Sequence, residues 1–450
     1  MRGRPRHAVQ GIDEVGTVTA LTHEGEGVVR NGKTAFIPGA LPAESVRFRR
    51  TRHHRQHDQA ELIEVIEQSP ARVTPRCAHF GVCGGCALQH LAPAAQLEAK
   101  EAELRDSFER VAGIRPAEWL APLRGPVWHY RRRARLGAKY VAKKGRVVVG
   151  FRERLAPYVA DVRRCEVLAP PVAELIEPLA TLLTELTIRE RVPQIEVAVG
   201  DNAVALVLRV LEPPDPSDLS RLRDFAALHS VRVFLQPKGL DSVRPLEATA
   251  VEPLEYRLSR FDLRLQFAPT DFVQINGPVN EALVARAVDL LALEPASVVL
   301  DLYCGIGNFT LALARAAARV VGVEGDAGLV ARARENARLN GLNNVEFHVA
   351  DLGQAIDPQT SWLRHGFTHV LLDPPRAGAS EIMPLIASLD PRRILYISCH
   401  PGSLARDAGL LVSQHAMGLQ AAGVLDMFPH TTHVESLALL VPGMPPREAT

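Results

Sequence analysis

The sequence lacks the long apolar segments that membrane proteins need. None of its apolar runs approaches the ~18 residues that cross a bilayer, and Met1–Gly16 carries three arginines but no apolar stretch of the kind found in signal peptides. Internal repeats and low-complexity segments are also missing. We therefore expect a soluble, cytosolic protein that contacts no membrane.

Cysteine is scarce, with six residues in a chain of 450. Disulfide bonds are rare in the reducing cytosol. The spacing of these cysteines is therefore better interpreted as catalytic or metal-binding chemistry.

The length predicts two or three domains, since single hydrophobic cores rarely serve so many residues. The net charge of +1 conceals an asymmetry, because residues 1–150 hold 25 Lys and Arg against 15 Asp and Glu. Clustered cations attract polyanions. The basic front part thus favours a nucleic-acid partner, although a solvated charged face would show the same balance.

The first 70 residues predict a small barrel. Five short strands fall between Val15 and Val65, and an Asn31-Gly32 pair marks a hairpin turn. This density of strands is typical of an OB-like fold. Its arginine-rich loop, Arg49–Arg55, is a candidate phosphate contact, with a flexible solvated loop as the alternative.

In the rest of the chain the predicted secondary structure changes twice. An amphipathic helix is predicted over Gln96–Val111, and residues 127–262 read as a mostly antiparallel β domain. From about residue 265, strands alternate with helices, which predicts a doubly wound parallel sheet. The strands expected there are Ser297–Leu300, Val320–Val323, Val345–Val349, Thr368–Leu372 and Arg393–Ser398.

A glycine-containing loop follows the first of these strands. In Asp301–Phe309, Gly305 and Gly307 allow the backbone to approach a ligand closely, at the sheet edge where such ligands bind. A dinucleotide fingerprint would place a third glycine where this chain has Thr310, so NAD is disfavoured.

Two later carboxylates complete the pattern. Glu324 ends the second strand, where it can accept hydrogen bonds from both ribose hydroxyls, and Asp351 follows the third strand, within reach of an adenine. This succession indicates S-adenosylmethionine. A glycine turn that serves helix packing alone is the alternative.

Cys399 and Asp373 each follow a predicted strand and should share the edge of the sheet with the cofactor. A thiolate that adds to C6 of uracil makes C5 nucleophilic toward a methyl donor, and a base must then remove the C5 proton. Glu435, at the start of a predicted strand over Glu435–Val441, is the candidate base. Considered alone, Cys399 would be an inert buried thiol and Glu435 an exposed carboxylate.

Several motifs together resemble the RNA uracil-C5 methyltransferases over nearly the whole chain. They are Gln274-Ile275-Asn276, Asp301-Leu302-Tyr303-Cys304-Gly305, Asp373-Pro374-Pro375-Arg376-Ala377-Gly378, Ser398-Cys399 and His433-Val434-Glu435. The resemblance implies that Cys399 is the nucleophile and Glu435 the base. It also implies that the cofactor and uracil pocket is lined by Gln274, Tyr303, Asn308, Glu324, Asp351 and Asp373.

Three residues near these motifs need separate comment. His400 stands where the family commonly has Asn or Asp, and Tyr303 where Phe is frequent. Neither departure removes a reacting group. Cys304, inside the glycine loop, is interpreted as a packing residue.

The remaining cysteines are Cys77, Cys83, Cys86 and Cys165. Four soft ligands suit zinc or an iron–sulfur cluster. Three clustered cysteines with one remote cysteine favour [4Fe–4S] over zinc, which usually takes two close pairs. The pattern also resembles the subgroup that acts on 23S ribosomal RNA, which carries a TRAM domain matching residues 15–66 and such a cluster.

The sequence therefore predicts a multidomain α/β protein with three parts. These are an OB-like TRAM domain (1–70), a central antiparallel β domain with a [4Fe–4S] cluster and RNA contacts (71–262), and a Rossmann-like, class I methyltransferase domain that uses S-adenosylmethionine (263–450). Helix 94–111 is expected to pack on the last domain. The expected substrate is 23S rRNA and the expected state a monomer. Methylation of transfer RNA or another rRNA site, and a non-catalytic RNA-binding assembly factor, are the alternatives.

Overall fold

The computed structural model describes residues 12–247, 251–354, 356–357, 359–443 and 447–448. Residues 1–11, assigned above to the barrel domain, lie outside the described residues. The chain divides into two compact units, Met1–Lys100 with Pro429–Thr432, and Glu101–Phe428 with His433–Thr450. Among the helices that the structure describes, none combines the length and apolar character that a membrane crossing requires.

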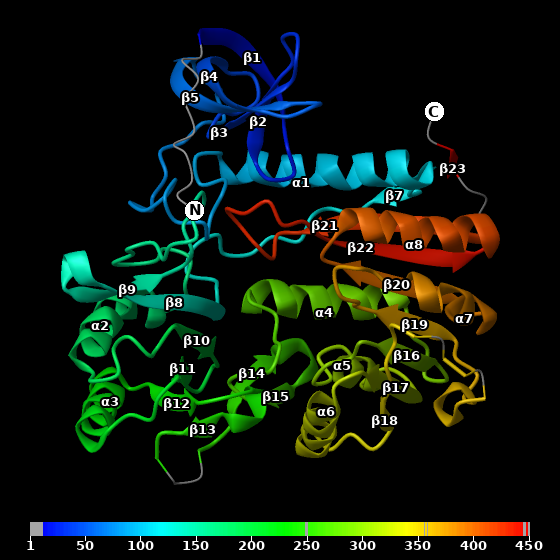
Figure 1. Cartoon of the computed structure of the whole chain (residues 1–450). Helices are drawn as coiled ribbons and strands as arrows, with labels where there is room; N and C mark the ends of the chain where they lie inside the picture. Colours follow the sequence, from blue (N-terminus) through cyan, green and yellow to red (C-terminus); the bar gives the residue numbers. More distant parts are fainter. Residues whose placement is uncertain (1–11, 248–250, 355, 358, 444–446, 449–450) are drawn as a thin grey trace. The chain divides into compact units, whose positions relative to one another are not determined.

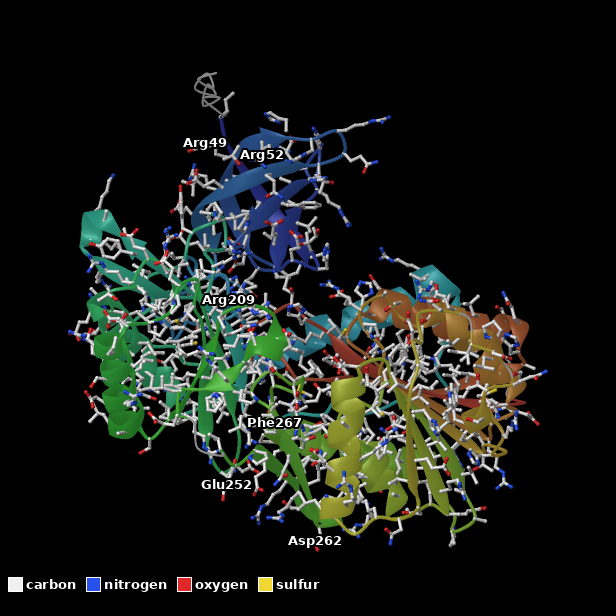
Figure 2. All side chains as sticks on the ribbon, turned by 60° about the horizontal axis from the view of Figure 1, so that its bottom comes forward. Arg49, Arg52, Arg209, Glu252, Asp262 and Phe267 are labelled. Atoms are coloured by element: carbon white, nitrogen blue, oxygen red, sulfur yellow. The ribbon has the colours of Figure 1, made fainter. Side chains whose placement is uncertain are left out.

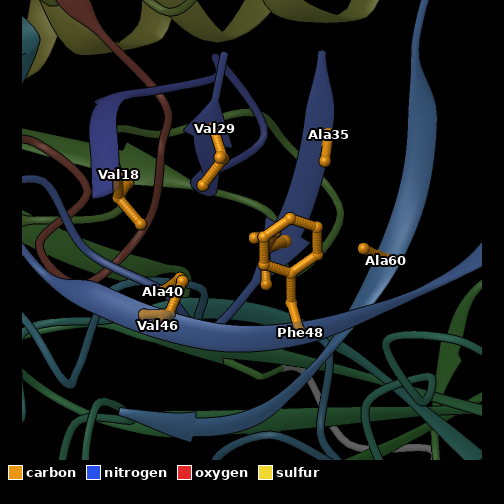
Figure 3. Close-up of a cluster of buried hydrophobic side chains, with 8 residues drawn as sticks. Val18, Val29, Ala35, Ala40, Val46, Phe48 and Ala60 are labelled. Carbon is orange, nitrogen blue, oxygen red and sulfur yellow. The ribbon is translucent and has the colours of Figure 1, made fainter. Parts of the chain in front are cut away.

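The first unit contains the predicted five-stranded barrel, which is confirmed. Its strands close in the order β1-β2-β3-β5-β4 (Figure 1). Side chains along β4 alternate between the core and the surface of the barrel. Val46 and Phe48 point inward, whereas Arg47 and Arg49 do not. These two residues pack with Val18, Val29, Ala35, Ile37, Ala40 and Ala60 (Figure 3). The strands are β1 (Asp13–Leu21), β2 (Glu26–Val29), β3 (Ala35–Pro38), β4 (Ser45–His53) and β5 (Asp58–Glu67).

A helix follows the barrel and the cysteine-containing loop. Helix α1 (Pro93–Ser107) continues into a π-helical turn over Phe108–Ala112. Leu97, Leu104 and Phe108 are buried as the pattern predicts, but Val111 is 55% exposed. The wider turn changes the angular phase of the helix, which explains the difference.

The second unit begins with a six-stranded sheet in the order β13-β12-β11-β10-β8-β9 (Figure 1). The sheet is not purely antiparallel as predicted, because β11 and β12 run parallel. A parallel pair needs a crossover, and helix α3, which the sequence reading missed, supplies it. The elements are β8 (Arg133–Val141), β9 (Arg146–Gly150), α2 (Val172–Glu185), β10 (Gln194–Val199), β11 (Val204–Arg209), α3 (Pro216–His229), β12 (Arg232–Gln236) and β13 (Arg244–Pro245).

Smaller β elements complete this part of the unit. The strands β14 (Leu254–Leu258) and β15 (Leu263–Phe267) form a hairpin, and the domain boundary predicted after residue 262 falls in its turn. The short strands β6 (Ile114–Arg115) and β23 (Arg447–Glu448) pair with each other.

An eight-stranded sheet dominates the unit, in the order β18-β17-β16-β19-β20-β22-β21-β7. Strands β16 to β20 are parallel, and β22 runs antiparallel between β20 and β21. Both α4 and α8 pack against β20 (Figure 1). The elements are β7 (Glu118–Trp119), α4 (Gly277–Leu291), β16 (Val298–Leu302), α5 (Thr310–Ala314), β17 (Arg319–Glu324), α6 (Ala327–Leu339), β18 (Val345–Val349), β19 (His369–Leu372), α7 (Met383–Ser388), β20 (Arg393–Ser398), α8 (Pro401–Gln414), β21 (Met417–Leu425) and β22 (Glu435–Pro442).

Candidate active site

The glycine loop leaves β16 at its carboxyl end, as the sequence predicts. Tyr303, Gly305 and Gly307 all have positive φ, at 63°, 55° and 92°. Such a conformation is unusual for a tyrosine and often marks a functional loop. The loop is fixed to the next strand, since the Cys304 N–H donates to the Val323 carbonyl at 3.1 Å. Cys304 itself is buried, which agrees with a packing role.

Glu324 lies directly beside this loop. One carboxylate oxygen accepts a hydrogen bond from the Gly305 N–H at 3.2 Å, and the other accepts from the Asp326 N–H at 3.1 Å. Each carboxylate oxygen has a second lone pair. Glu324 can therefore shape the loop and still accept hydrogen bonds from a ligand's hydroxyl groups.

Tyr303 and Asp351 meet at the end of β18. The Tyr303 hydroxyl donates to the Leu352 carbonyl at 3.4 Å, next to Asp351. The Asp351 carboxylate is exposed and accepts from the Gly353 N–H at 3.0 Å and from the Gln354 amide at 2.7 Å. Thus the three segments that follow β16, β17 and β18 lie along one edge of the sheet.

Asn308 is held by two residues that the sequence reading missed. Its Oδ1 accepts from the Tyr256 hydroxyl at 2.8 Å and from Asn280 Nδ2 at 3.0 Å, while its Nδ2 donates to Asn280 Oδ1 at 2.9 Å. Burial raises the pKa of Tyr256, which keeps the hydroxyl protonated as a donor. Tyr256 and Asn280 therefore position the far end of the glycine loop.

A cavity of about 240 Å³ adjoins these residues. Its lining includes Arg132, Tyr256, Arg257, Gln274 and Asn280. The Gln274 amide donates to Asp373 Oδ2 at 3.4 Å, which connects the cavity to the carboxyl end of β19. The charges of the lining balance, because Asp201 and Glu281 also line the cavity and Arg132 pairs with Asp201 at 2.7 Å.

Asp301, which is fully buried, and Asp373, which is half-buried, are carboxyl groups at this edge. Burial raises the pKa of Asp301 to about 7 and that of Asp373 to about 7. Asp301 Oδ2 accepts from the Thr310 hydroxyl, whereas its Oδ1 is buried and has no partner among the described protein atoms. Such raised pKa values are frequent at functional sites.

Cys399 and Glu435 are brought together by strand register. Strands β20 and β22 are antiparallel, with Ser398 opposite Ser436. Cys399 directly follows Ser398 and Glu435 directly precedes Ser436, and the charge of Glu435 acts on the Cys399 thiol. Glu435 is buried. The register thus places the ends of β20 and β22 that adjoin Cys399 and Glu435 at one edge of the sheet, although 36 positions separate these residues in the sequence.

The thiol of Cys399 rests in its protonated form. Burial, followed by the charges of Glu435 and Asp373, raises its pKa to about 11, while Arg376 acts in the opposite direction. A thiolate is the reactive form of cysteine. Cations near Cys399 therefore favour its reaction.

His400, one of the two departures from the family pattern, caps helix α8. Its Nδ1 accepts a hydrogen bond from the Ser403 N–H at 3.1 Å, so the ring proton of a neutral imidazole is on Nε2. Asn and Asp cap helices through the same acceptor geometry. This shared function explains why histidine can replace them here.

The four remaining cysteines are divided between the units. Cys77, Cys83 and Cys86 belong to the first unit, and Cys165 belongs to the second. Across the described residues, no group of three or more Cys, His, Asp and Glu side chains is arranged to hold a metal ion. The cluster predicted from the sequence therefore stays a prediction.

Comparisons with known proteins identify the family of the chain. The model of the family described as tRNA (uracil-5-)-methyltransferase matches residues 93–442. A relative from Alkalilimnicola ehrlichii is 50% identical over 423 residues, covering 94% of this chain and 95% of the relative. Another, from Xanthomonas campestris, is 49% identical over 426 residues, covering 94% and 96%. Both are named 23S rRNA (uracil(1939)-C(5))-methyltransferase RlmD.

A solved structure shares the architecture. It is the Pyrococcus abyssi tRNA (uracil-54, C5)-methyltransferase in complex with S-adenosyl-L-homocysteine. The TM-score is 0.73 at 25% sequence identity, and the match covers 95% of this chain and 100% of that chain.

Proposed function

Since the chain belongs to the tRNA (uracil-5-)-methyltransferase family, we propose that it methylates C5 of one uridine in 23S rRNA and thereby forms 5-methyluridine. The observation that supports the proposal is the register of β20 and β22, which pairs Ser398 with Ser436 and so brings the adjoining Cys399 and Glu435 to the sheet edge that also holds the glycine loop. The names of its relatives support 23S rRNA as substrate and position 1939 as target.

The cofactor residues fit S-adenosylmethionine. Glu324 offers carboxylate oxygens to ribose hydroxyls, Asp351 is exposed at the end of β18, and the loop at Gly305 and Gly307 permits close approach. The cofactor supplies the methyl group when bound. Gln274 and Asp373, joined by their hydrogen bond, are proposed to contact the cofactor and the uracil.

The reaction uses both protein groups at the end of β20. The Cys399 thiol gives its proton to water, its sulfur bonds to C6 of uracil, and the resulting electron pair at C5 would take the methyl group and release S-adenosylhomocysteine. Glu435 then removes the C5 proton, so that the double bond re-forms and the sulfur–C6 bond breaks. The target base is expected to leave its stack, because sulfur must approach C6 from one face of the ring.

A few arginines in the described part of the barrel form no ion pair with an acidic side chain, and they are the support for an RNA substrate in this part of the chain. Several arginines of β4 bind acidic side chains, as in the pairs Arg49–Asp13 and Arg50–Glu14. Arg52 and Arg55 are exposed, and within the described part of the barrel neither forms an ion pair. These two arginines are therefore the best candidates for phosphate contacts (Arg49 and Arg52 are labelled in Figure 2).

Cys77, Cys83, Cys86 and Cys165 are proposed to hold a [4Fe–4S] cluster, with zinc as the alternative. In support, the donor set is wholly thiolate, and the Gly85 N–H donates to the Cys83 sulfur at 3.4 Å. Amide hydrogen bonds to sulfur are typical of such clusters. Protein purified without oxygen should contain iron and sulfide in equal amounts. A colourless protein with one zinc would refute the cluster.

Transfer RNA is the second candidate substrate, because both the family description and the Pyrococcus structure name it. A competition assay separates the two. Wild-type protein is given a methyl-labelled cofactor with an equimolar mixture of unmethylated 23S rRNA and tRNA. Label should enter 23S rRNA, and preferential labelling of tRNA would reject the rRNA assignment.

A further inference from the structure

Asp407 is a fully buried carboxylate on α8 that the proposed reaction does not use. Its Oδ2 accepts hydrogen bonds from the Ala379 N–H and the Tyr396 hydroxyl, each at 2.7 Å. Its Oδ1 accepts from Arg406 Nε at 2.8 Å. A buried charge costs free energy unless hydrogen bonds or ion pairs compensate for it. The three hydrogen bonds to Asp407 are therefore needed to keep its carboxylate in the core.

The three donors come from the segments that build the site. Ala379 follows the loop of residues 373–378, Tyr396 lies on β20 three positions before Cys399, and Arg406 is on α8. Arg406 also donates to the Ala377 carbonyl at 2.9 Å. One buried carboxylate thus connects the loop after β19 with the strand that carries the nucleophile.

Gly378 shows how closely the loop approaches this pair. Its φ is +85°, and a Cβ atom there would lie 2.5 Å from Asp407 Oδ2 and 2.6 Å from the Arg406 guanidinium. A side chain could not be added without displacing the buried carboxylate. Asp407 and Arg406 therefore pack directly against the loop of residues 374–378 and restrict its position.

This loop carries Arg376, an exposed cation whose charge acts on Cys399. The other charges that act on the thiol, Glu435 and Asp373, are negative and disfavour the thiolate. The effect of Arg376 is the smallest of these charge effects, because water screens its exposed guanidinium.

We propose that Asp407 is a positioning residue for the methyl transfer reaction, which holds the loop of residues 374–378 against β20, the strand that ends directly before Cys399. Its effect on turnover rests on the proposed function. Its effect on the thiol does not, because the thiol can be probed without RNA.

The test measures alkylation of Cys399 by iodoacetamide between about pH 7 and 9, followed by mass spectrometry of the Cys399 peptide. Below the thiol pKa the rate increases with pH, since only the thiolate reacts. Asp407→Asn, Arg406→Gln and Arg376→Ala should each slow alkylation at a given pH by about twofold, which corresponds to a small rise in the thiol pKa, as expected for a solvent-screened charge. Asp407→Asn and Arg406→Gln should also lower kcat for methyl transfer while KM for the cofactor stays unchanged.

Asp218→Asn is the matched control. Asp218, in the first turn of helix α3, is also fully buried and accepts hydrogen bonds from the Thr187 N–H and hydroxyl at 2.8 and 2.6 Å. It should lose stability without a change in Cys399 alkylation. If Asp407→Asn does not fold, Arg406→Gln still tests the proposal. The Arg406 side chain is 43% exposed, so its replacement should not prevent folding.

Unchanged alkylation in Arg406→Gln or Arg376→Ala would overturn the proposal, and so would an equal slowing in Asp218→Asn. If wild-type protein methylated no RNA while the alkylation shifts appeared, the proposed function would fail but the positioning role of Asp407 would stand.

Discussion

At the scale of single residues, Cys399 and Glu435 have separable roles. If Glu435 removes the C5 proton after methyl transfer, Glu435→Gln should stop the reaction at the covalent stage. A protein–RNA adduct that survives denaturing electrophoresis should then accumulate, whereas Cys399→Ala should form none. Glu196→Gln, which changes another buried strand carboxylate, should behave like wild type. An adduct formed by Cys399→Ala would contradict the assignment.

The charge of Glu435 also makes a prediction about pH. Glu435 helps to raise the Cys399 pKa to about 11, so removing its charge should lower that pKa and increase the thiolate fraction at every pH below it. Glu435→Gln should therefore be alkylated faster than wild type at about pH 8 in the absence of RNA. Slower alkylation would show that Glu435 does not face the thiol.

His400 should be replaceable by another helix-capping residue. His400→Asn keeps an acceptor for the Ser403 N–H and should retain stability and methyl transfer, whereas His400→Ala should lose about 0.5–2 kcal/mol of unfolding free energy. Urea unfolding of the two variants measures the difference. Equal stability of both variants would reject the capping role.

At the scale of elements, the glycine loop depends on its neighbours β14 and α4. Tyr256→Phe removes one hydrogen bond to Asn308, worth about 0.5–1.5 kcal/mol. Binding of S-adenosylmethionine should weaken by roughly two- to tenfold, as calorimetry would measure. Tyr158→Phe, at an exposed tyrosine, is the control. Unchanged affinity in Tyr256→Phe would mean that the loop holds its shape without this contact.

The sequence predicts elements better than it predicts their pairing. The barrel strands and the strands that end at Ser398 and begin at Glu435 follow from alternation and apolar runs. The placement of Cys399 and Glu435 beside a paired position does not, because it depends on the register of β20 and β22. Tyr256 and Asn280 were missed for a similar reason, since only tertiary packing brings them to Asn308. For His400, its place before Pro401 at a helix start was an available signal.

At the scale of the whole molecule, the basic front half should contribute to RNA affinity through a few cations. Replacing both Arg52 and Arg55 by Ala should weaken RNA binding and reduce the salt dependence of the binding constant, because fewer counterions are released. Replacing Arg47 and Arg49, which pair with Glu64 and Asp13, should have a smaller effect. The reverse order would contradict this assignment of phosphate contacts.

The central claim, that this chain methylates one uridine of 23S rRNA through Cys399, is tested most directly by mapping 5-methyluridine in that RNA. Cells that lack the chain are compared with cells that express either wild-type protein or Cys399→Ala. We predict that 5-methyluridine appears at position 1939, the position named for the relatives, only with wild-type protein. Its absence with wild-type protein, or its presence with Cys399→Ala, would contradict the account.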